Sequence, residues 1–204
     1  MIVIDGPQGT PEWFEAKRAR PSASNFNKIC TTTGAPSKQR QSYLYELAGQ
    51  AVSGQVAESY TTTAMLEGTR REAESRALFE LLHDVEVRQV AVVYPDEEKK
   101  YVCSPDGLFN NDTCGLELKN PLAKTMVGYL LDGKLPTEYI LQVQGSLLVT
   151  GLDVWQFMAY CPNMPVLDIE VHRDEKLISR LKEELEKFVF DLASTIRKLK
   201  KMGD

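Results

Sequence analysis

Three residues in the middle of the chain have types and a spacing that suit chemistry: Asp106, Glu117 and Lys119. Asp106 stands in Ser-Pro-Asp-Gly, and the ten residues after it are rich in Asn, Asp and Gly, as turns are. Glu117 and Lys119 then flank a leucine in a short apolar run that predicts a strand, whose alternation sends both side chains to one face. If residues 101–103 also form a strand, an antiparallel ribbon brings Asp106 beside Glu117.

Two carboxylates and an ammonium group at one small site predict metal-dependent hydrolysis of a phosphodiester. Carboxylate oxygens are the ligands that magnesium prefers, and the ion usually keeps positions for water and a substrate phosphate. A lysine among such acids orients or helps to deprotonate the attacking water, or stabilises charge in the transition state. The alternative is that Pro-Asp-Gly is an ordinary turn and that Glu117 and Lys119 are a solvated pair. An acid and a lysine are costly to bury without a role, which favours the site.

The remaining sequence predicts the helices and strands that would position these groups. Apolar residues at helical spacing predict helices over residues 11–18, 25–29, 38–53, 61–83, 121–131, 136–151 and 174–202. β-branched and aromatic runs predict strands over residues 86–94, 101–103, 117–119, 153–160 and 166–171. The segment before the first helix is predicted to be irregular. The expected fold class is α/β, with a central mixed sheet of about five strands flanked by helices.

Several helical residues are candidates for the site or for the core. Glu72 is a candidate further metal carboxylate on the 61–83 helix, whose predicted apolar face consists of Met65, Leu66, Leu78, Phe79 and Leu82. Gln142 and Gln144 need partners if they are buried, and one of them is expected to face the site. The last helix has an apolar stripe typical of core packing: Leu177, Ile178, Leu181, Leu185, Phe188, Val189, Leu192 and Ile196.

With 204 residues and no break in composition, the chain is expected to form one domain over residues 1–204. Its hydrophobic content of 43% and charged content of 26% are those of ordinary globular proteins. No apolar run approaches the roughly 20 residues of a membrane span, and the N-terminus lacks a signal-peptide pattern, so we expect a cytoplasmic protein without a membrane partner. The formal net charge of -5 argues against a uniformly basic nucleic-acid binder, although a local basic cluster remains compatible with DNA.

Cysteine and histidine chemistry is not indicated. The four cysteines lack the spacing of zinc sites, and we expect them to be reduced and mostly buried. His83 and His172 are far apart, so neither a histidine metal site nor a Ser-His-Asp triad is favoured. Near the N-terminus, Lys17 and Arg18 precede Ser24, which stands at the predicted start of a helix that offers donors to an anion. A simple serine cap beside a solvated basic face is the alternative reading of these residues.

Together these motifs resemble the lambda exonuclease (YqaJ-type) family of phage recombination nucleases, within the PD-(D/E)xK nuclease superfamily. The resemblance rests first on Ser-Pro-Asp-Gly, then Glu-Leu-Lys, then Gln-Val-Gln on a predicted helix. It extends over nearly the whole chain, through Trp13 and residues 22–24, 67–72, 77–80, 103–108, 115–119 and 142–144. The common order of these segments along the chain carries the resemblance.

This resemblance implies a restriction-endonuclease-like core and a 5′-to-3′ exonuclease that degrades one strand of linear double-stranded DNA, leaving 3′ overhangs. It implies two Mg2+ ions in each active site, with Mn2+ able to substitute. It further implies a ring-shaped homotrimer around DNA ends and a single-strand annealing protein as the partner in phage recombination, within a bacterial host.

Carried over by position, the resemblance assigns metal binding to Asp106, Glu117, the backbone carbonyl of Leu118, and Glu72. Lys119 would orient or activate the attacking water, and Gln142 would help to hold that water. These roles agree with the chemistry that the residue types themselves predict.

The pocket for the 5′ phosphate would use Ser24, Ser104 and a basic residue from the first helix. The family's arginine stands four residues after the tryptophan, where this chain has Lys17, with Arg18 next. Either Arg18 takes the role after a small shift, or Lys17 takes it as a point charge without the bidentate fork. A second basic residue is expected from the following loop, with two candidates: Lys38 and Arg40.

Two other functions are compatible with the same core. The trio specifies hydrolysis but not dependence on DNA ends, so a structure-specific or restriction-type endonuclease is one alternative. A protein that binds DNA ends without cutting is the other, although competent residues at all three core positions count against it. A calcium-binding protein is disfavoured because EF-hand spacing is absent.

Overall fold

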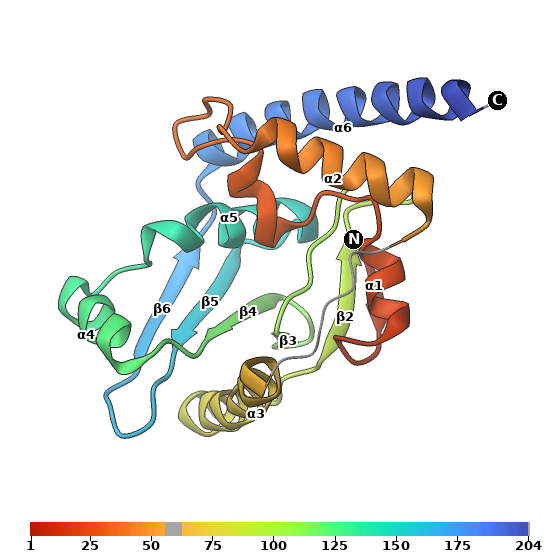
Figure 1. Ribbon diagram of the computed structural model, residues 1–204. Coiled ribbons are helices and arrows are strands. Elements are labelled where there is room, and N and C mark those ends of the chain that lie inside the picture. The colour runs from red at the N-terminus through yellow and green to blue at the C-terminus, as the bar shows by residue number, and fades with distance from the viewer. Residues whose placement is uncertain (56–62, 204) are drawn as a thin grey trace.

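The computed structural model describes residues 1–55 and 63–203, and the side chains of residues 1–55 and 71–203. Figure 1 shows strands between two helical layers, with α2 (Arg40–Ser53) and α6 (Glu175–Gly203) side by side along the top and α3 (Thr63–His83) at the bottom. The α/β class with a mixed sheet, as predicted from the sequence, is confirmed.

The main sheet has four strands in the order β3-β4-β5-β6. β3 (Gly107–Phe109) pairs antiparallel with β4 (Cys114–Lys119), and β4 pairs parallel with β5 (Val154–Ala159). β5 then pairs antiparallel with β6 (Leu167–His172). The two inner strands, β4 and β5, are mostly buried, as expected for strands that are covered on both faces.

A second, two-stranded sheet pairs β1 (Ile2–Asp5) antiparallel with β2 (Val90–Tyr94), which corrects the prediction of an irregular start. Its four-residue β1 is formed because the fully buried β2 offers it a partner, a condition that the local sequence does not reveal. Residues 101–103 form only isolated bridges, including Val93 with Cys103, and no strand of the main sheet. The main sheet therefore has four strands where about five were expected.

The ribbon beside Asp106 begins later in the chain than predicted, because β3 rather than residues 101–103 pairs with β4. The turn between them uses Asn110, Asn111 and Asp112, at φ values of 52°, 57° and 61°. Asn and Asp adopt this left-handed region more readily than other non-glycine residues do. Gly107 has no room for a side chain, since a Cβ there would lie 2.1 Å from Val87 Cγ1. The glycine therefore serves close packing within a strand.

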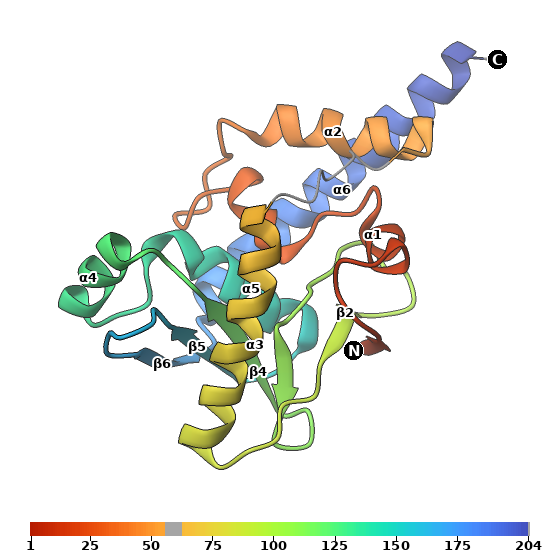
Figure 2. The same cartoon turned by 60° about the horizontal axis from the view of Figure 1, so that its bottom comes forward.

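The remaining helices are α1 (Pro11–Lys17), η1 (Ala23–Lys28), α4 (Ala123–Asp132), η2 (Thr137–Tyr139) and α5 (Ile140–Thr150). The second predicted helix is thus a 3₁₀ helix, and the helix expected from Pro136 begins with a 3₁₀ turn. α5 packs on η1 and on α6 near the middle of the molecule (Figure 2). None of the helices in the described part of the chain is long and apolar enough to cross a membrane.

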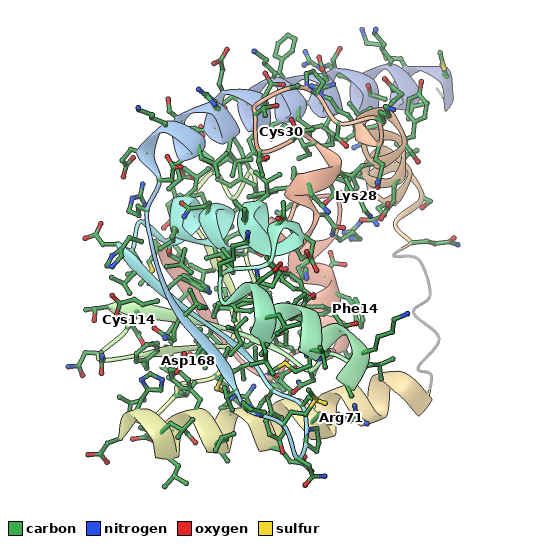
Figure 3. The ribbon with its side chains drawn as sticks, turned by 90° about the vertical axis from the view of Figure 1, so that its left-hand side faces the viewer. Phe14, Lys28, Cys30, Arg71, Cys114 and Asp168 are labelled. Atoms are coloured by element: carbon green, nitrogen blue, oxygen red, sulfur yellow. The ribbon has the colours of Figure 1, made fainter. Side chains whose placement is uncertain are left out.

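The apolar stripe predicted for α6 is confirmed. Leu177, Ile178, Leu181, Leu185, Phe188 and Leu192 are buried, while Val189 and Ile196 are partly buried against the same cluster. In Figure 3, helix α5 lies between α6 and the sheet, and side chains fill the space between α6 and α5. The cysteines are free, and all except the half-buried Cys114 are buried, as expected.

The apolar face predicted for α3 is only partly correct. Phe79 is buried, but Leu82 is 56% exposed and Leu81 is 79% exposed. Polar residues face inward instead, including the fully buried Ser75, because α3 covers the part of the sheet where Asp106 lies. The side chains of the other predicted members, Met65 and Leu66, and of Glu67 and Gly68 in the family motif, lie outside the described residues.

Candidate active site

Asp106 precedes β3 directly, and both its backbone and its side chain are bonded to β4. Its amide donates to the carbonyl oxygen of Leu116 at 3.0 Å, and the amide of Leu118 donates to Asp106 Oδ2 at 2.6 Å. The carboxylate is therefore fixed at the edge of the strand that carries Glu117. The proximity of these two acids, expected from a ribbon, is produced by β3 and β4.

Glu117 and Lys119 lie on one face of β4, where strand alternation brings their side chains together. Lys119 Nζ forms an ion pair with Glu117 Oε1, and Gln142 Nε2 from α5 donates to the same oxygen at 2.5 Å. Only 2% of Glu117 is exposed. Lys119 Nζ also lies 5.2 Å from the centroid of the Tyr139 ring. The acid, the lysine and the amide thus form one connected group.

Helix α3 contributes Glu72 and Arg76, and Arg76 contacts Asp106. Arg76 Nη2 donates to Glu72 Oε1 at 2.5 Å. The same guanidinium directs Nε and Nη2 at the backbone carbonyl oxygen of Asp106, at 3.3 and 3.2 Å. Glu72 is therefore held near the other acids through an arginine that it shares with Asp106.

Burial raises the pKa values of all three acids, and repulsion from neighbouring acids adds to the rise for Glu117 and Glu72. Burial raises the pKa of Glu117 to about 7, with Lys119 opposing the rise and Asp106 adding to it. Burial also raises the pKa of Asp106 against the effect of Lys119, and burial together with Asp106 raises the pKa of Glu72. Burial opposes the charge on Lys119, but the carboxylates of Glu117 and Asp106 prevail and raise its pKa. A cation bound near these acids would favour their charged forms.

The donor set fits a hard divalent cation in its chemistry, because three carboxylates supply oxygen ligands. It is not already gathered into a ligand shell: among the described residues, no three His, Cys, Asp or Glu side chains are grouped closely enough to hold a metal. Instead Lys119 binds an oxygen of Glu117, and Arg76 binds an oxygen of Glu72. Both contacts use the Oε1 oxygens, so the Oε2 oxygens of Glu117 and Glu72 are the ones that would face a divalent cation.

A cavity of about 300 Å³ borders Asp106 and Glu72. Residues 6–9, a Gly-Pro-Gln-Gly segment, form part of its wall. Gln8 Nε2 donates to the carbonyl oxygen of Pro105 at 2.8 Å, so this segment supports the loop that carries Asp106. The cavity leaves room for substrate beside the acids.

Of the two basic candidates at the end of α1, Lys17 is the one whose charge interacts with the acids. Its Nζ lies 3.9 Å from the centroid of the Trp13 ring. Burial lowers the pKa of Lys17 to about 8, and nearby Cys103, Glu117 and Asp106 counteract that decrease. Lys17 is therefore a partly buried cation within electrostatic reach of the candidate site.

Arg18, by contrast, is engaged at the surface. Its Nε and Nη2 donate to the two carboxylate oxygens of Glu15, at 2.8 and 2.5 Å. Arg18 and Lys17 both border a separate cavity of about 150 Å³ between α1 and α2. The guanidinium fork that was a candidate for the phosphate is thus already satisfied by a neighbouring acid.

The two serines expected at the phosphate pocket belong to different hydrogen-bond networks. Ser104 Oγ donates to the carbonyl oxygen of Ala91 at 2.6 Å and accepts from Trp13 Nε1 at 2.8 Å. Ser24 is exposed on η1, with its Oγ 3.1 Å from that of Ser22. Ser104 is therefore tied to the tryptophan that packs against Lys17, whereas Ser24 remains at the surface.

The two basic candidates from the following loop also differ. Arg40 Nη2 donates to Asp191 Oδ2 at 2.9 Å, and its guanidinium packs over Phe188 at 5.4 Å from the ring centroid. Arg40 is thus bound to α6. Lys38 is exposed.

Gln144 and His83 have structural partners. Gln144 Nε2 donates to the carbonyl oxygen of His172 at 2.8 Å, and its Oε1 accepts from the amide of Asp174 at 2.9 Å. It joins the end of β6 to the start of α6, while Gln142 faces Glu117. His83 Nε2 lies 2.6 Å from Asp168 Oδ2.

A model of the YqaJ-like viral recombinase domain matches residues 12–153, well over half of the chain. The chain belongs to this family. The matched YqaJ-like segment includes Lys17, Glu72, Asp106, Glu117 and Gln142. A search of curated proteins found no match.

Solved structures resemble this YqaJ-like protein over almost its full length. An alkaline exonuclease, LHK-Exo from Laribacter hongkongensis, has 29% identity and a TM-score of 0.84, with 95% of this chain and 98% of that chain covered. LHK-Exo in complex with dAMP gives 28% identity at the same TM-score and coverage. A phage related exonuclease from Haemophilus somnus 129PT has 12% identity and a TM-score of 0.63, with 93% and 99% of the two chains covered, which shows a shared fold.

Two residues at the candidate site of this YqaJ-like domain are not among those predicted from sequence. Arg76 follows Glu72 by four residues, a spacing that pairs an acid and an arginine on one helix face, so a signal for it was present. Gln8 lacks such a signal, because its partner Pro105 is 97 residues away.

Proposed function

We propose that this protein is a metal-dependent 5′-to-3′ exonuclease that degrades one strand of linear double-stranded DNA and leaves 3′ overhangs for recombination by strand annealing. The observation that carries the proposal is the group of Asp106, Glu117 and Lys119 at β4, with Gln142 and Glu72 beside it. Membership in the YqaJ-like family and the likeness to an alkaline exonuclease support DNA as the substrate. In this proposal residues 1–204 act as one nuclease domain.

The candidate metal ligands are Asp106, Glu117, Glu72 and the backbone carbonyl of Leu118. In this proposal they hold two Mg2+ ions, for which Mn2+ substitutes, because both metals suit oxygen ligands. When bound, such ions supply positive charge that stabilises the negative charge developing on the phosphate during hydrolysis.

Lys119 acts on the attacking water as a hydrogen-bond donor and stabilises charge in the transition state. This role follows from its raised pKa, since an ammonium group beside Glu117 and Asp106 keeps its proton. Gln142 fixes the orientation of Glu117 by donating to the oxygen that Lys119 also binds. The two donors thereby hold the carboxylate in one orientation.

The deciding experiment is magnesium-dependent digestion of a linear duplex labelled at one 5′ end, beside the same DNA as a covalently closed circle. An end-dependent exonuclease releases the 5′ label early as mononucleotide, leaves the circle intact and stops when EDTA is added. Cutting of the circle would establish the alternative endonuclease. Binding to ends without any cleavage would establish a DNA-end-binding protein.

Lys17 is proposed to bind the 5′ phosphate, together with Ser104 and Ser24. Lys17→Ala is expected to lower the preference for a phosphorylated over a hydroxyl 5′ end about tenfold, the effect of losing roughly 1.4 kcal/mol of charge-assisted bonding. The wild-type preference in kcat/KM should also fall as the pH rises above about 8, where free Lys17 loses its proton. The ratio of initial rates on the two kinds of end measures both effects.

Arg18→Ala is the matched comparison, because it removes a neighbouring basic residue that already pairs with Glu15. Its preference for phosphorylated ends should equal that of the wild type. A reduced preference in this variant alone would transfer the role to Arg18.

The proposed assembly is a ring-shaped homotrimer around DNA ends that works with a single-strand annealing protein. Support for both comes from the resemblance to the lambda exonuclease family. Light scattering tests the homotrimer, because it measures the mass of the assembly, which can be compared with the 22.9 kDa of one chain.

A further inference from the structure

We propose that Arg76 is a positioning residue that sets the placement of Glu72 relative to Asp106 and thereby the affinity of the site for its divalent cation. This inference rests on the proposed function, since it assigns metal binding to these two acids. It adds a residue that acts through the ligands rather than on the substrate.

The contacts of Arg76 join two separate elements of the fold. Glu72 belongs to α3, and Asp106 lies at the start of the β3–β4 ribbon. The guanidinium binds the Glu72 carboxylate at 2.5 Å and the main-chain carbonyl oxygen of Asp106 at 3.2 and 3.3 Å. Because a carbonyl oxygen of the main chain cannot rotate away, the arginine uses Asp106 as an anchor for Glu72.

The burial of Arg76 makes this arrangement specific. Its side chain is 12% exposed, whereas that of Glu72 is 35% exposed. A planar guanidinium offers several donors in a fixed geometry, so it can serve a carboxylate and a carbonyl together, which the point charge of a lysine does less well. Without Arg76, Glu72 would be free to turn toward solvent, away from the repulsion of Asp106.

The charge and the geometry of Arg76 predict opposite effects on metal binding. A positive charge beside the site repels a divalent cation, so removing the charge alone would strengthen metal binding. An arginine that positions the ligands instead strengthens binding, so its loss would weaken the site. Residues that orient metal ligands typically contribute about 10- to 100-fold in metal affinity.

The test is calorimetric titration of the full-length, DNA-free protein with MnCl2, for the wild type, Arg76→Lys and Arg76→Gln. Both variants should bind Mn2+ at least about tenfold more weakly, because both lose the fork. In the nuclease assay both should need a correspondingly higher Mg2+ concentration for half-maximal rate, and cleavage should recover substantially when Mg2+ is saturating.

Arg173→Gln is a matched control. Arg173 makes the same kinds of contact, from Nε to Glu175 at 2.7 Å and from Nη1 to the carbonyl oxygens of Leu147 and Leu152 at 2.8 and 3.2 Å. It connects the end of β6 to α5 and contacts none of the candidate acids. A general loss of stability would therefore appear in this variant too, while its Mn2+ affinity should equal that of the wild type.

The inference would be overturned if Arg76→Lys bound Mn2+ with wild-type affinity and Arg76→Gln bound it more tightly. That result would show that Arg76 affects the site only through its positive charge. Equal weakening in Arg173→Gln would also overturn the inference. In both cases wild-type digestion of linear DNA would leave the proposed function intact. A wild type that neither binds Mn2+ nor digests DNA would overturn the proposed function and this inference together.

Discussion

Replacing Lys119 with alanine is expected to lower the rate of DNA cleavage about a thousandfold, because a positioned hydrogen-bond donor that stabilises transition-state charge typically contributes about 10²- to 10³-fold. DNA binding should remain nearly unchanged, since the ammonium group acts on the water and the reacting phosphate rather than on the duplex as a whole. Single-turnover cleavage at saturating Mg2+ measures the first effect, and a filter-binding or anisotropy titration in Ca2+ measures the second.

Lys124→Ala is the control for this prediction, because Lys124 is an exposed lysine on the neighbouring helix α4. It should cleave at the wild-type rate. Loss of Lys119 also leaves the buried Glu117 without its ion pair, so the thermal unfolding of the variant must be recorded to separate lost chemistry from lost structure. Wild-type turnover in a folded Lys119→Ala protein would contradict the proposed role of Lys119 in cleavage.

The substitution Glu117→Gln is expected to reduce cleavage by a factor on the order of a thousand or more, because it removes a charged metal ligand whose contribution is several kcal/mol. The amide retains the size of the carboxyl group and can still accept a hydrogen bond from Gln142. Steady-state cleavage and Mn2+ calorimetry should therefore both show the loss in a protein that remains folded. Wild-type Mn2+ affinity would contradict the assignment of Glu117 as a ligand.

Glu117 should also shape the stability of the metal-free protein as a function of pH. Its pKa is raised from the ordinary 4.5 to about 7, so the folded state retains a proton that the unfolded state releases. The associated stability is complete below about pH 4.5 and is lost as the pH rises to about 7. Asp106 and Glu72, whose pKa values are also raised, contribute with the same sign.

Urea unfolding in EDTA, repeated between about pH 4.5 and pH 8, should therefore show a free energy of unfolding that falls with pH. The fall should be smaller in Glu117→Gln. Glu183→Gln is the control, because Glu183 is exposed on α6 and paired with Lys187, which lowers its pKa. An identical pH dependence in wild type and Glu117→Gln would show that Glu117 is ionised throughout this range.

Local pattern was enough to predict which residues the structure brings together at most of the candidate site. Strand alternation places Glu117 and Lys119 on one face whatever the surrounding fold, and helical periodicity correctly predicts the buried stripe of α6. Gln142 and Gln144 were both expected to need partners on one helix. Only the packing of that helix against β4 and β6 shows that Gln142 is the one that faces the site. The sequence also contained the four-residue spacing of Glu72 and Arg76, which predicts a pair on α3 but not its target.

Other features of the fold and the candidate site depend on contacts between segments that are distant in sequence, so only the tertiary structure decided them. β1 exists because β2 offers it a partner, and Gln8 supports the Asp106 loop across 97 residues of sequence. Arg18 and Lys17 are adjacent in sequence, yet one pairs with Glu15 at the surface and the other approaches the acids. Local sequence specifies periodicity and charge, because these depend on neighbouring residues. Desolvation depends on which segments pack around the acids, and it raises their pKa values. The sequence alone therefore determined which chemical groups are available, and the fold determined which of them lie together in a buried site.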